Sequence, residues 1–462
     1  MPGSTDRDGV APGAELPAAP RPVSGVTRWL ARASPGLFVA YAGTVAFVTY
    51  FAMYSFRKPF AAAHFQDARL WILDLKTALV LSQVAGYALS KFLGIKFNSE
   101  MPPARRAWAL VLLIAWAEVA LVVFAVVPPP GKAVALFLNG LPLGTVWGIV
   151  FSFLEGRRTS EILGAGLSCA YVVASGAVKS VGAALLHAGV SESWMPAATG
   201  ALFLPVFCAA VYGLSLVPPP SPADVAARTE REPMLRGDRH RFLRTYWPGL
   251  VLLVVVYVVL TSFRDFRDNF AAEIWTDLGR GGDASVFVVP EILIGLSVLA
   301  VLALLYLVRN NRRGLLWTYV IMASGAALMG VSTALFDLGV ISPMTWMVLV
   351  GLGLYLGYVP YGCVLFDRTI AALRIVATAV FLIYVSDAIA YPGSVAIQLY
   401  KAVGQAGISK LTFLRYFAYV TCGVCLVCLA ASCRYFLRRA SETTGEPAGA
   451  PGEQPAPAIA ST

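Results

Sequence analysis

The stretches FRKPFAA at 56–62 and FRDNFAA at 266–272 share five of their seven residues and lie 210 residues apart. Each stretch closes a long apolar segment. The pair Arg-Thr at 158–159 recurs at 368–369, and the pair Arg-Arg at 105–106 recurs at 312–313. The stretches YVVAS at 171–175 and YVSDA at 384–388 are 213 residues apart. The sequence therefore predicts two related halves, each built on the same succession of segments.

Apolar residues dominate the chain. It has 462 residues, of which 58% are hydrophobic and 13% charged, whereas a soluble domain has about 45–50% apolar and about 25% charged residues. Twelve apolar segments are each long enough to cross roughly 30 Å of hydrocarbon, and helices satisfy their own backbone groups inside lipid. We therefore expect an all-α integral membrane protein with twelve transmembrane helices. The predicted spans are 36–62, 74–97, 107–127, 133–154, 162–187, 197–217, 246–270, 285–308, 315–337, 343–366, 375–399 and 413–437.

The polar segments divide these spans into two sets of six. We expect a disordered cytoplasmic tail at 1–35, an N-terminal half at 36–217, a basic cytoplasmic linker at 218–245, a C-terminal half at 246–437 and a second disordered tail at 438–462. Lysine and arginine gather in the segments that are cytoplasmic if both termini lie inside. The net charge of +10 is thus explained by topology, and we expect no nucleic-acid partner.

Duplicated six-helix halves joined by a basic loop resemble the layout of the major facilitator superfamily. The resemblance implies a substrate site near the membrane midplane between the halves, which rock around it. We therefore expect a multi-pass protein of a bacterial cytoplasmic (inner) membrane, working as a monomer in the lipid bilayer.

Several charged residues fall inside the predicted spans. Arg57 and Lys58 lie side by side with no acidic residue nearby in sequence, and an uncompensated charge in hydrocarbon costs roughly 2.5–3.5 kcal/mol on insertion scales. Helical spacing places Tyr50, Tyr54, Arg57, Ala61 and His64 along one face of the first span. On the seventh span, Tyr257, Thr261, Arg264 and Asp268 repeat this spacing, with Arg267 beside them, and Gln83, Tyr87 and Lys91 form a polar stripe on the second.

A structural role is the alternative for each of these cations. Arg57, Lys58 and Lys91 can lie at the membrane interface with their heads reaching water. Arg264 and Arg267 can form local ion pairs with Asp265 or Asp268.

The residues of the first two spans also resemble the organophosphate:phosphate antiporters, the glycerol-3-phosphate and hexose-phosphate transporters of the superfamily. The likeness is carried by YSFRKPF at 54–60, DLKTAL at 74–79 and YALSKF at 87–92. It implies that Arg57, Lys91 and one of Arg264 or Arg267 bind a phosphate from the two halves. The histidine of the family's fifth helix falls on Tyr171 in this chain, and Lys179 lies two turns further along the same span. The candidate substrate-binding residues are Tyr54, Arg57, Lys58, Tyr87, Lys91, Tyr171, Lys179, Arg264 and Arg267.

Two arginines on opposite halves would form a planar, bidentate trap for an anion. Binding would draw the halves together, and differential affinity for the closed state is what a transport cycle requires. The predicted function is therefore secondary transport of a small anionic substrate, an organic phosphate exchanged for inorganic phosphate.

Carboxylates inside the spans support an alternative. Asp387, Glu291 and Glu118 are candidate proton carriers for a proton-coupled symporter of a carboxylate or other solute, and a pair between Lys179 and Asp387 across the halves is a structural alternative. A transporter-like sensor that binds without transporting is a third hypothesis. The chain lacks the HExxH, GxSxG and P-loop motifs, so we expect no enzyme. A cysteine series at 422, 425, 428 and 433 does not fit iron–sulfur spacing, and we expect no metal and no cofactor.

Overall fold

Long apolar segments fold into helices because the helix pairs every backbone group within the segment. The computed structural model describes residues 24–65, 69–99, 101–155, 157, 159–221, 224, 236–308, 310–373 and 379–444. Within these residues, twelve helices have 18 residues or more, one on each predicted span. They are α2 (Pro35–Met53), α3 (Leu75–Ser99), α4 (Arg106–Val126), α5 (Pro129–Ser152), α6 (Ser160–His187), α7 (Met195–Ser215), α9 (Arg236–Asn269), α11 (Val289–Tyr306), α12 (Asn311–Asp337), α13 (Pro343–Cys363), α15 (Ala379–Leu399) and α16 (Lys410–Thr444). The all-α membrane fold is thus confirmed.

The remaining elements are short. They are α1 (Gly25–Arg32), α10 (Ala271–Asp277), α14 (Leu365–Leu373), the 3-10 turns η1 (Tyr54–Phe56), η2 (Pro59–Ala62), η3 (Pro103–Arg105) and η4 (Ala284–Phe287), the π-turn η5 (Tyr400–Gly404), and an antiparallel ribbon of β1 (Arg69–Leu70) and β2 (Leu73–Asp74). Among the described residues, ten helical segments are long and apolar enough to span a bilayer; α3 and α15 are the two long helices outside that set.

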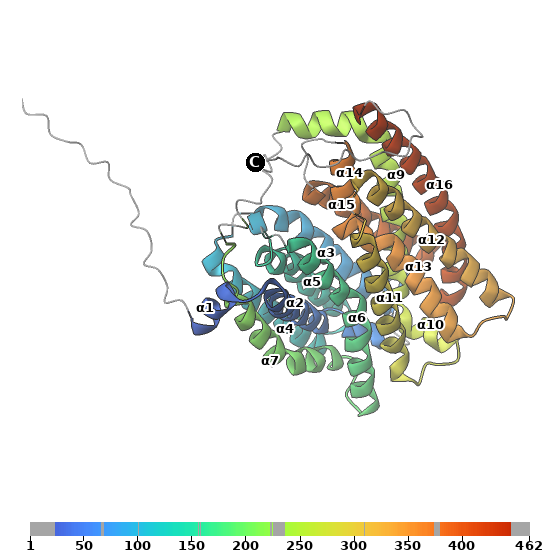
Figure 1. Cartoon of the computed structure of the whole chain (residues 1–462). Coiled ribbons are helices and arrows are strands. Elements are labelled where there is room, and N and C mark those ends of the chain that lie inside the picture. Colours follow the sequence, from blue (N-terminus) through green and yellow to red (C-terminus); the bar gives the residue numbers. More distant parts are fainter. Residues whose placement is uncertain are drawn as a thin grey trace, which may run out of the picture.

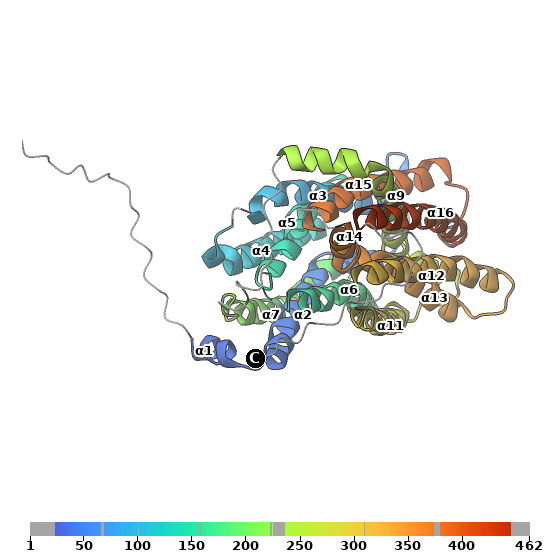
Figure 2. The same ribbon diagram turned by 45° about the horizontal axis from the view of Figure 1, so that its top comes forward.

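The helices form two bundles of six. Helices α2 to α7 gather on one side and α9 to α16 on the other (Figure 1). The bundles meet along two junctions, where α3 packs against α15 and α6 packs against α11, and both views show these pairs side by side (Figure 2). In the repeat, α3 corresponds to α11 and α6 to α15, so the two junctions are equivalent. The arrangement agrees with the two pseudo-symmetric six-helix halves predicted from the sequence.

The ends of the bundles differ from the sequence-based boundaries. The helix α1 lies inside the stretch expected to be a disordered tail, where the Ser24 side chain caps it and the Thr27 hydroxyl donates to the Leu216 carbonyl at 2.9 Å. Helix α9 begins at Arg236, within the expected linker, and α16 continues to Thr444. The tails at 1–23 and 445–462 lie outside the described residues.

The first span is not one continuous helix. Helix α2 ends at Met53, and the two 3-10 turns that follow are separated by Arg57 and Lys58. Pro59 explains the break, because its ring lacks an N–H and would clash with the carbonyl of a preceding helical turn. The expectation that one helical face continues as far as His64 is therefore wrong beyond Met53. The second copy of the motif also ends a helix, since α9 stops at Asn269 before α10 begins.

Glycines allow α3 and α5 to approach each other closely. A Cβ atom on Gly140 would lie 2.4 Å from the carbonyl oxygen of Gln83, and one on Gly86 would lie 2.2 Å from that of Phe137. Small residues at helix crossings are the usual means of close packing in membranes. The contact matters for the site, because α3 carries Tyr87 and Lys91.

We expect Gly140→Val to destabilise the protein by about 1–3 kcal/mol, because overpacking forces the two backbones apart. Thermal unfolding of the purified protein measures the loss. Gly423→Val on α16 is the matched control, since a Cβ there meets no atom within 4 Å. Equal melting of the two variants would contradict the close-packing argument.

Candidate binding cavity

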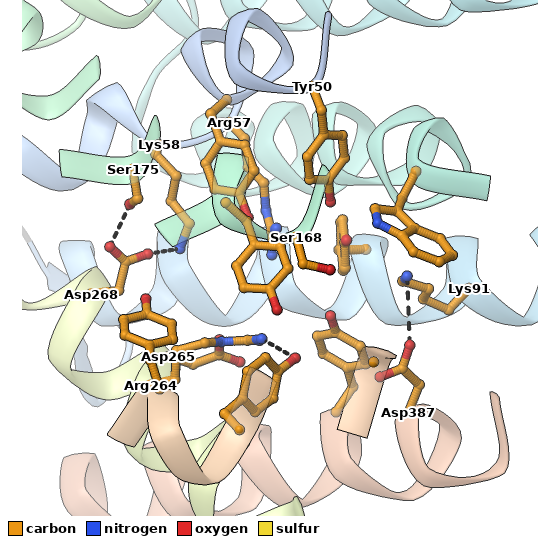
Figure 3. A pocket seen from close by; sticks show the side chains of 18 of the residues that line it. Tyr50, Arg57, Lys58, Lys91, Ser168, Ser175, Arg264, Asp265, Asp268 and Asp387 are labelled. Carbon is orange, nitrogen blue, oxygen red and sulfur yellow. Dashed lines mark hydrogen bonds and ion pairs between the residues drawn. The ribbon is translucent and has the colours of Figure 1, made fainter. Parts of the chain in front are cut away.

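A cavity of about 110 Å³ lies between the two bundles. Both halves contribute to it, and its lining is rich in tyrosine and charged side chains (Figure 3). The lining residues are Tyr50, Tyr54, Arg57, Lys58, Tyr87, Lys91, Trp147, Ser168, Tyr171, Ser175, Tyr257, Arg264, Asp265, Asp268, Tyr355, Tyr358, Gly362, Ile383, Asp387 and Tyr391. The cavity thus brings together seven of the nine predicted substrate-binding residues; Lys179 and Arg267 do not line it.

Arg57 is buried, with 6% of its surface exposed. Its guanidinium carbon lies 3.7 Å from the centre of the Tyr87 ring and 5.9 Å from that of Tyr54, distances at which a cation is attracted to an aromatic face. Among the described residues it forms no ion pair, and its Nε atom has no hydrogen-bond partner. The interfacial position offered as an alternative is therefore wrong for Arg57.

Two amide side chains hold the broken backbone that carries Arg57. The Gln83 side chain donates to the Arg57 carbonyl at 2.9 Å, and the Asn139 side chain donates to the Phe56 carbonyl at 2.9 Å. The two amides also bond to each other at 2.8 Å. Carbonyls released by the helix break are thus satisfied inside the protein, which is the condition for irregular backbone at membrane depth. Discontinuous helices of this kind form the substrate sites of many transporters.

The two arginines of α9 have different environments. Arg264 lines the cavity, donates to Asp265 Oδ1 at 2.8 Å and to the Tyr358 hydroxyl, and lies over the Tyr358 ring. Arg267 donates to Glu291 at 2.7 Å and to the Met347 carbonyl at 3.2 Å, away from the cavity. Arg264 is therefore both cavity-facing and locally paired.

A three-residue charge cluster crosses between the halves. One carboxylate oxygen of Asp268 lies 2.5 Å from Lys58 Nζ, a contact shown in Figure 3. The other oxygen lies 2.6 Å from Lys179 Nζ. The Ser175 hydroxyl also donates to it, and Lys58 donates to Asn269 at 2.7 Å. Lys179 therefore pairs with Asp268 and not with Asp387, because both lie at the end of the bundle where α9 stops.

Asp387 belongs to a second link between the halves. Its carboxylate lies 3.6 Å from Lys91 Nζ and accepts the Tyr257 hydroxyl at 2.7 Å. Tyr87 and Tyr391 pack edge to face beside this link, with ring centres 5.3 Å apart. Asp387 is the one proton-coupling candidate that lines the cavity.

The other two carboxylate candidates lie outside the lining. Glu291 is held by Arg267. Glu118 is half-buried beside Gly200, and its Oε2 atom has no hydrogen-bond partner among the described residues.

Sequence reasoning missed three tyrosines of the C-terminal half and one lysine. Tyr355, Tyr358 and Tyr391 sit in apolar spans, where a phenol needs a polar partner, and that mismatch is a detectable signal. Lys76 is fully buried and donates to the carbonyls of Ala61 and Ala63 at 2.8 and 2.6 Å. It also reaches Glu273 of the other half at 3.0 Å.

The sequence matches the model of one family over most of its length. That model, described as a family of unknown function (DUF5690), matches residues 59–439. The chain belongs to DUF5690. No curated protein matches this DUF5690 chain.

Solved structures with the same fold are transporters by name. A D-xylose–proton symporter covers 88% of this chain and 98% of its own, at 12% identity and a TM-score of 0.57. A peptide transporter, POT, covers 90% of this chain and 98% of its own, at 14% identity and a TM-score of 0.58. At these identities the likeness shows the fold of this DUF5690 chain alone, and no substrate.

Proposed function

We propose that the protein is a secondary transporter that moves a small anion, an organic phosphate exchanged for inorganic phosphate, by alternating access. The observation that carries the proposal is Arg57, a buried guanidinium that faces the cavity between the halves without an ion-pair partner in the described chain. An unpaired buried charge is costly, and an arriving anion would offset that cost.

The charges of the lining support an anionic solute. Four cations and three carboxylates line the cavity. Asp265 pairs with Arg264, Asp387 with Lys91, and Asp268 with Lys58 as well as Lys179 outside the lining. Arg57 therefore remains as an excess positive charge. Its planar fork suits the two oxygens of a phosphate or carboxylate, and Arg264 on the opposite half is the proposed partner.

Alternating access requires that contacts between the halves break and re-form. At the end where α2 stops, Lys58 contacts Asp268 and Lys76 contacts Glu273 across the halves. With both termini cytoplasmic in a bacterial inner membrane, as we propose, this is the periplasmic end. The pairs then act as the gate that opens when the halves rock, within a single protomer.

Exchange in proteoliposomes tests this function. Vesicles loaded with inorganic phosphate are expected to take up radiolabelled phosphate, and external sugar phosphates are expected to compete. Arg415→Ala is the matched control for Arg57→Ala, because Arg415 pairs with the partly exposed Asp337 far from the cavity. If neutral or cationic solutes bind and no anion does, the proposal is overturned.

We expect Glu273→Gln to increase access to the cavity from the periplasmic side. The substitution removes the charge that faces the buried Lys76, so the closed gate loses stability relative to the open one. Labelling of a cysteine at Ser175 by an impermeant thiol reagent measures the shift, in a background whose native cysteines have been replaced. Unchanged labelling would contradict the gate assignment.

Proton-coupled symport is a second candidate because Asp387 lines the cavity between Lys91 and Tyr257. Protonation of this carboxylate would release Lys91 from its partner and so change the charge of the site. Uptake driven by an imposed pH gradient without internal substrate, and lost in Asp387→Asn, would favour this function over exchange.

A further inference from the structure

A second, apolar cavity of about 590 Å³ lies between the halves beside the charged one. Three elements of the C-terminal half and two of the N-terminal half form its walls. The lining residues are Val39, Ala40, Gly43, Thr44 and Phe47 of α2, Ile162, Leu163 and Gly166 of α6, Leu299, Leu302, Ala303 and Leu305 of α11, Cys363 and Val364, and Asp367 and Arg368 of α14. We call it the apolar crevice.

Small residues keep the crevice open. A Cβ atom on Gly166 would meet no atom within 4 Å, and one on Gly43 would meet only Leu163, at 3.6 Å. Ala40 and Ala303 line the crevice from α2 and α11. These positions have space for larger side chains. The small residues here are therefore not required by close contact between backbones, whereas the glycines between α3 and α5 are.

The crevice adjoins the charged cavity along three helices. On α2, Phe47 of the crevice is one turn from Tyr50 of the cavity. On α6, Gly166 precedes Ser168, and at the end of α13 Gly362 of the cavity precedes Cys363 of the crevice. The lining of the cavity that holds Arg57 therefore continues into the crevice, whose nearest α2 residue, Phe47, lies ten residues before Arg57.

We propose that the transported anion is amphipathic, with its charged group at Arg57 and an apolar chain in the crevice. This inference rests on the proposed function and names its substrate class. Val39 and Phe47 are eight residues apart on α2, so the crevice extends about 12 Å along the helix. Burial of a methylene group is worth about 0.8 kcal/mol, so chain length should govern affinity.

Competition by alkyl phosphates tests the inference. Purified protein in zwitterionic nanodiscs binds radiolabelled inorganic phosphate, and methyl, butyl and hexyl phosphate are added as competitors. We expect affinity to rise roughly fourfold for each added methylene. Equal competition by methyl and hexyl phosphate would overturn the inference while leaving the proposed function intact. If no phosphate binds, the proposed function fails and the inference fails with it.

A substitution that fills the crevice tests whether the apolar chain binds there or in the surrounding bilayer. Gly166→Phe should remove most of the gain from hexyl over methyl phosphate and leave the affinity for methyl phosphate unchanged. Gly423→Phe is the matched control, because Gly423 also lies on a long helix with open space at its Cβ and is remote from both cavities. A chain-length gain that persists in Gly166→Phe would overturn the proposal.

Discussion

Arg57→Ala is expected to weaken anion binding roughly 30-fold or more, since truncating one partner of a buried charge pair costs about 2–5 kcal/mol. The same substitution removes a buried charge that has no ion-pair partner in the described chain, so the ligand-free protein should melt no lower than wild type. Binding of radiolabelled phosphate and thermal unfolding, each with and without phosphate, measure the two effects. Together they distinguish a binding residue from a structural one.

Arg57→Lys sharpens this prediction. Lysine keeps the positive charge but lacks the planar fork that grips two oxygens at once, so an intermediate loss is expected. Arg415→Ala should bind phosphate as wild type does. If Arg57→Ala binds phosphate normally, or melts far below wild type while Arg415→Ala does not, Arg57 is structural.

Asp268→Asn is expected to destabilise the protein by about 3–5 kcal/mol, because breaking a buried ion pair leaves its partner charges uncompensated. Here two lysines, Lys58 and Lys179, lose their shared carboxylate, and their side chains are 5% and 4% exposed. Thermal unfolding in detergent measures the loss. Adding Lys179→Met to Asp268→Asn should recover part of it, because one of the stranded charges is then removed.

The control for Asp268 is an ion pair near water. Asp337→Asn breaks the pair with Arg415, whose side chains are 27% and 35% exposed, and such pairs contribute about 0–1 kcal/mol. If Asp268→Asn and Asp337→Asn melt alike, the buried cluster does not hold the halves together.

The fold was predictable from the sequence because hydropathy and an internal repeat each constrain it separately. Twelve apolar segments specify the helices, and FRKPFAA and FRDNFAA align the halves. The position of Arg57 in the lining of the cavity was predictable for a similar reason, since a charge in an apolar span requires a compensating partner. The break in the first span was not predicted, although Pro59 is a helix-breaking residue, because the apolar character of the span continues beyond the proline.

The pairing of the charges was less predictable. Sequence spacing places Arg264 and Arg267 on nearby parts of one helix, and only the packing of α11 and α13 around Arg267 decides that Arg264 faces the cavity. For Lys179, the repeat suggested Asp387 as a partner, whereas the structure pairs it with Asp268. The carboxylate that Lys179 contacts depends on how far each helix is shifted along the bundle axis. The span boundaries predicted from hydropathy do not determine that shift.

The contact between Lys58 and Asp268 has a consequence for the origin of the chain. The two residues occupy the same position in the two copies of the repeated motif, and they contact each other across the two halves. The same charged residue in both copies would bring two like charges together, and like charges repel at such a distance. A duplicated ancestor with the same charged residue in both copies would therefore lack this contact. Divergence at this position makes the halves complementary, and neither half can be replaced here by a second copy of the other.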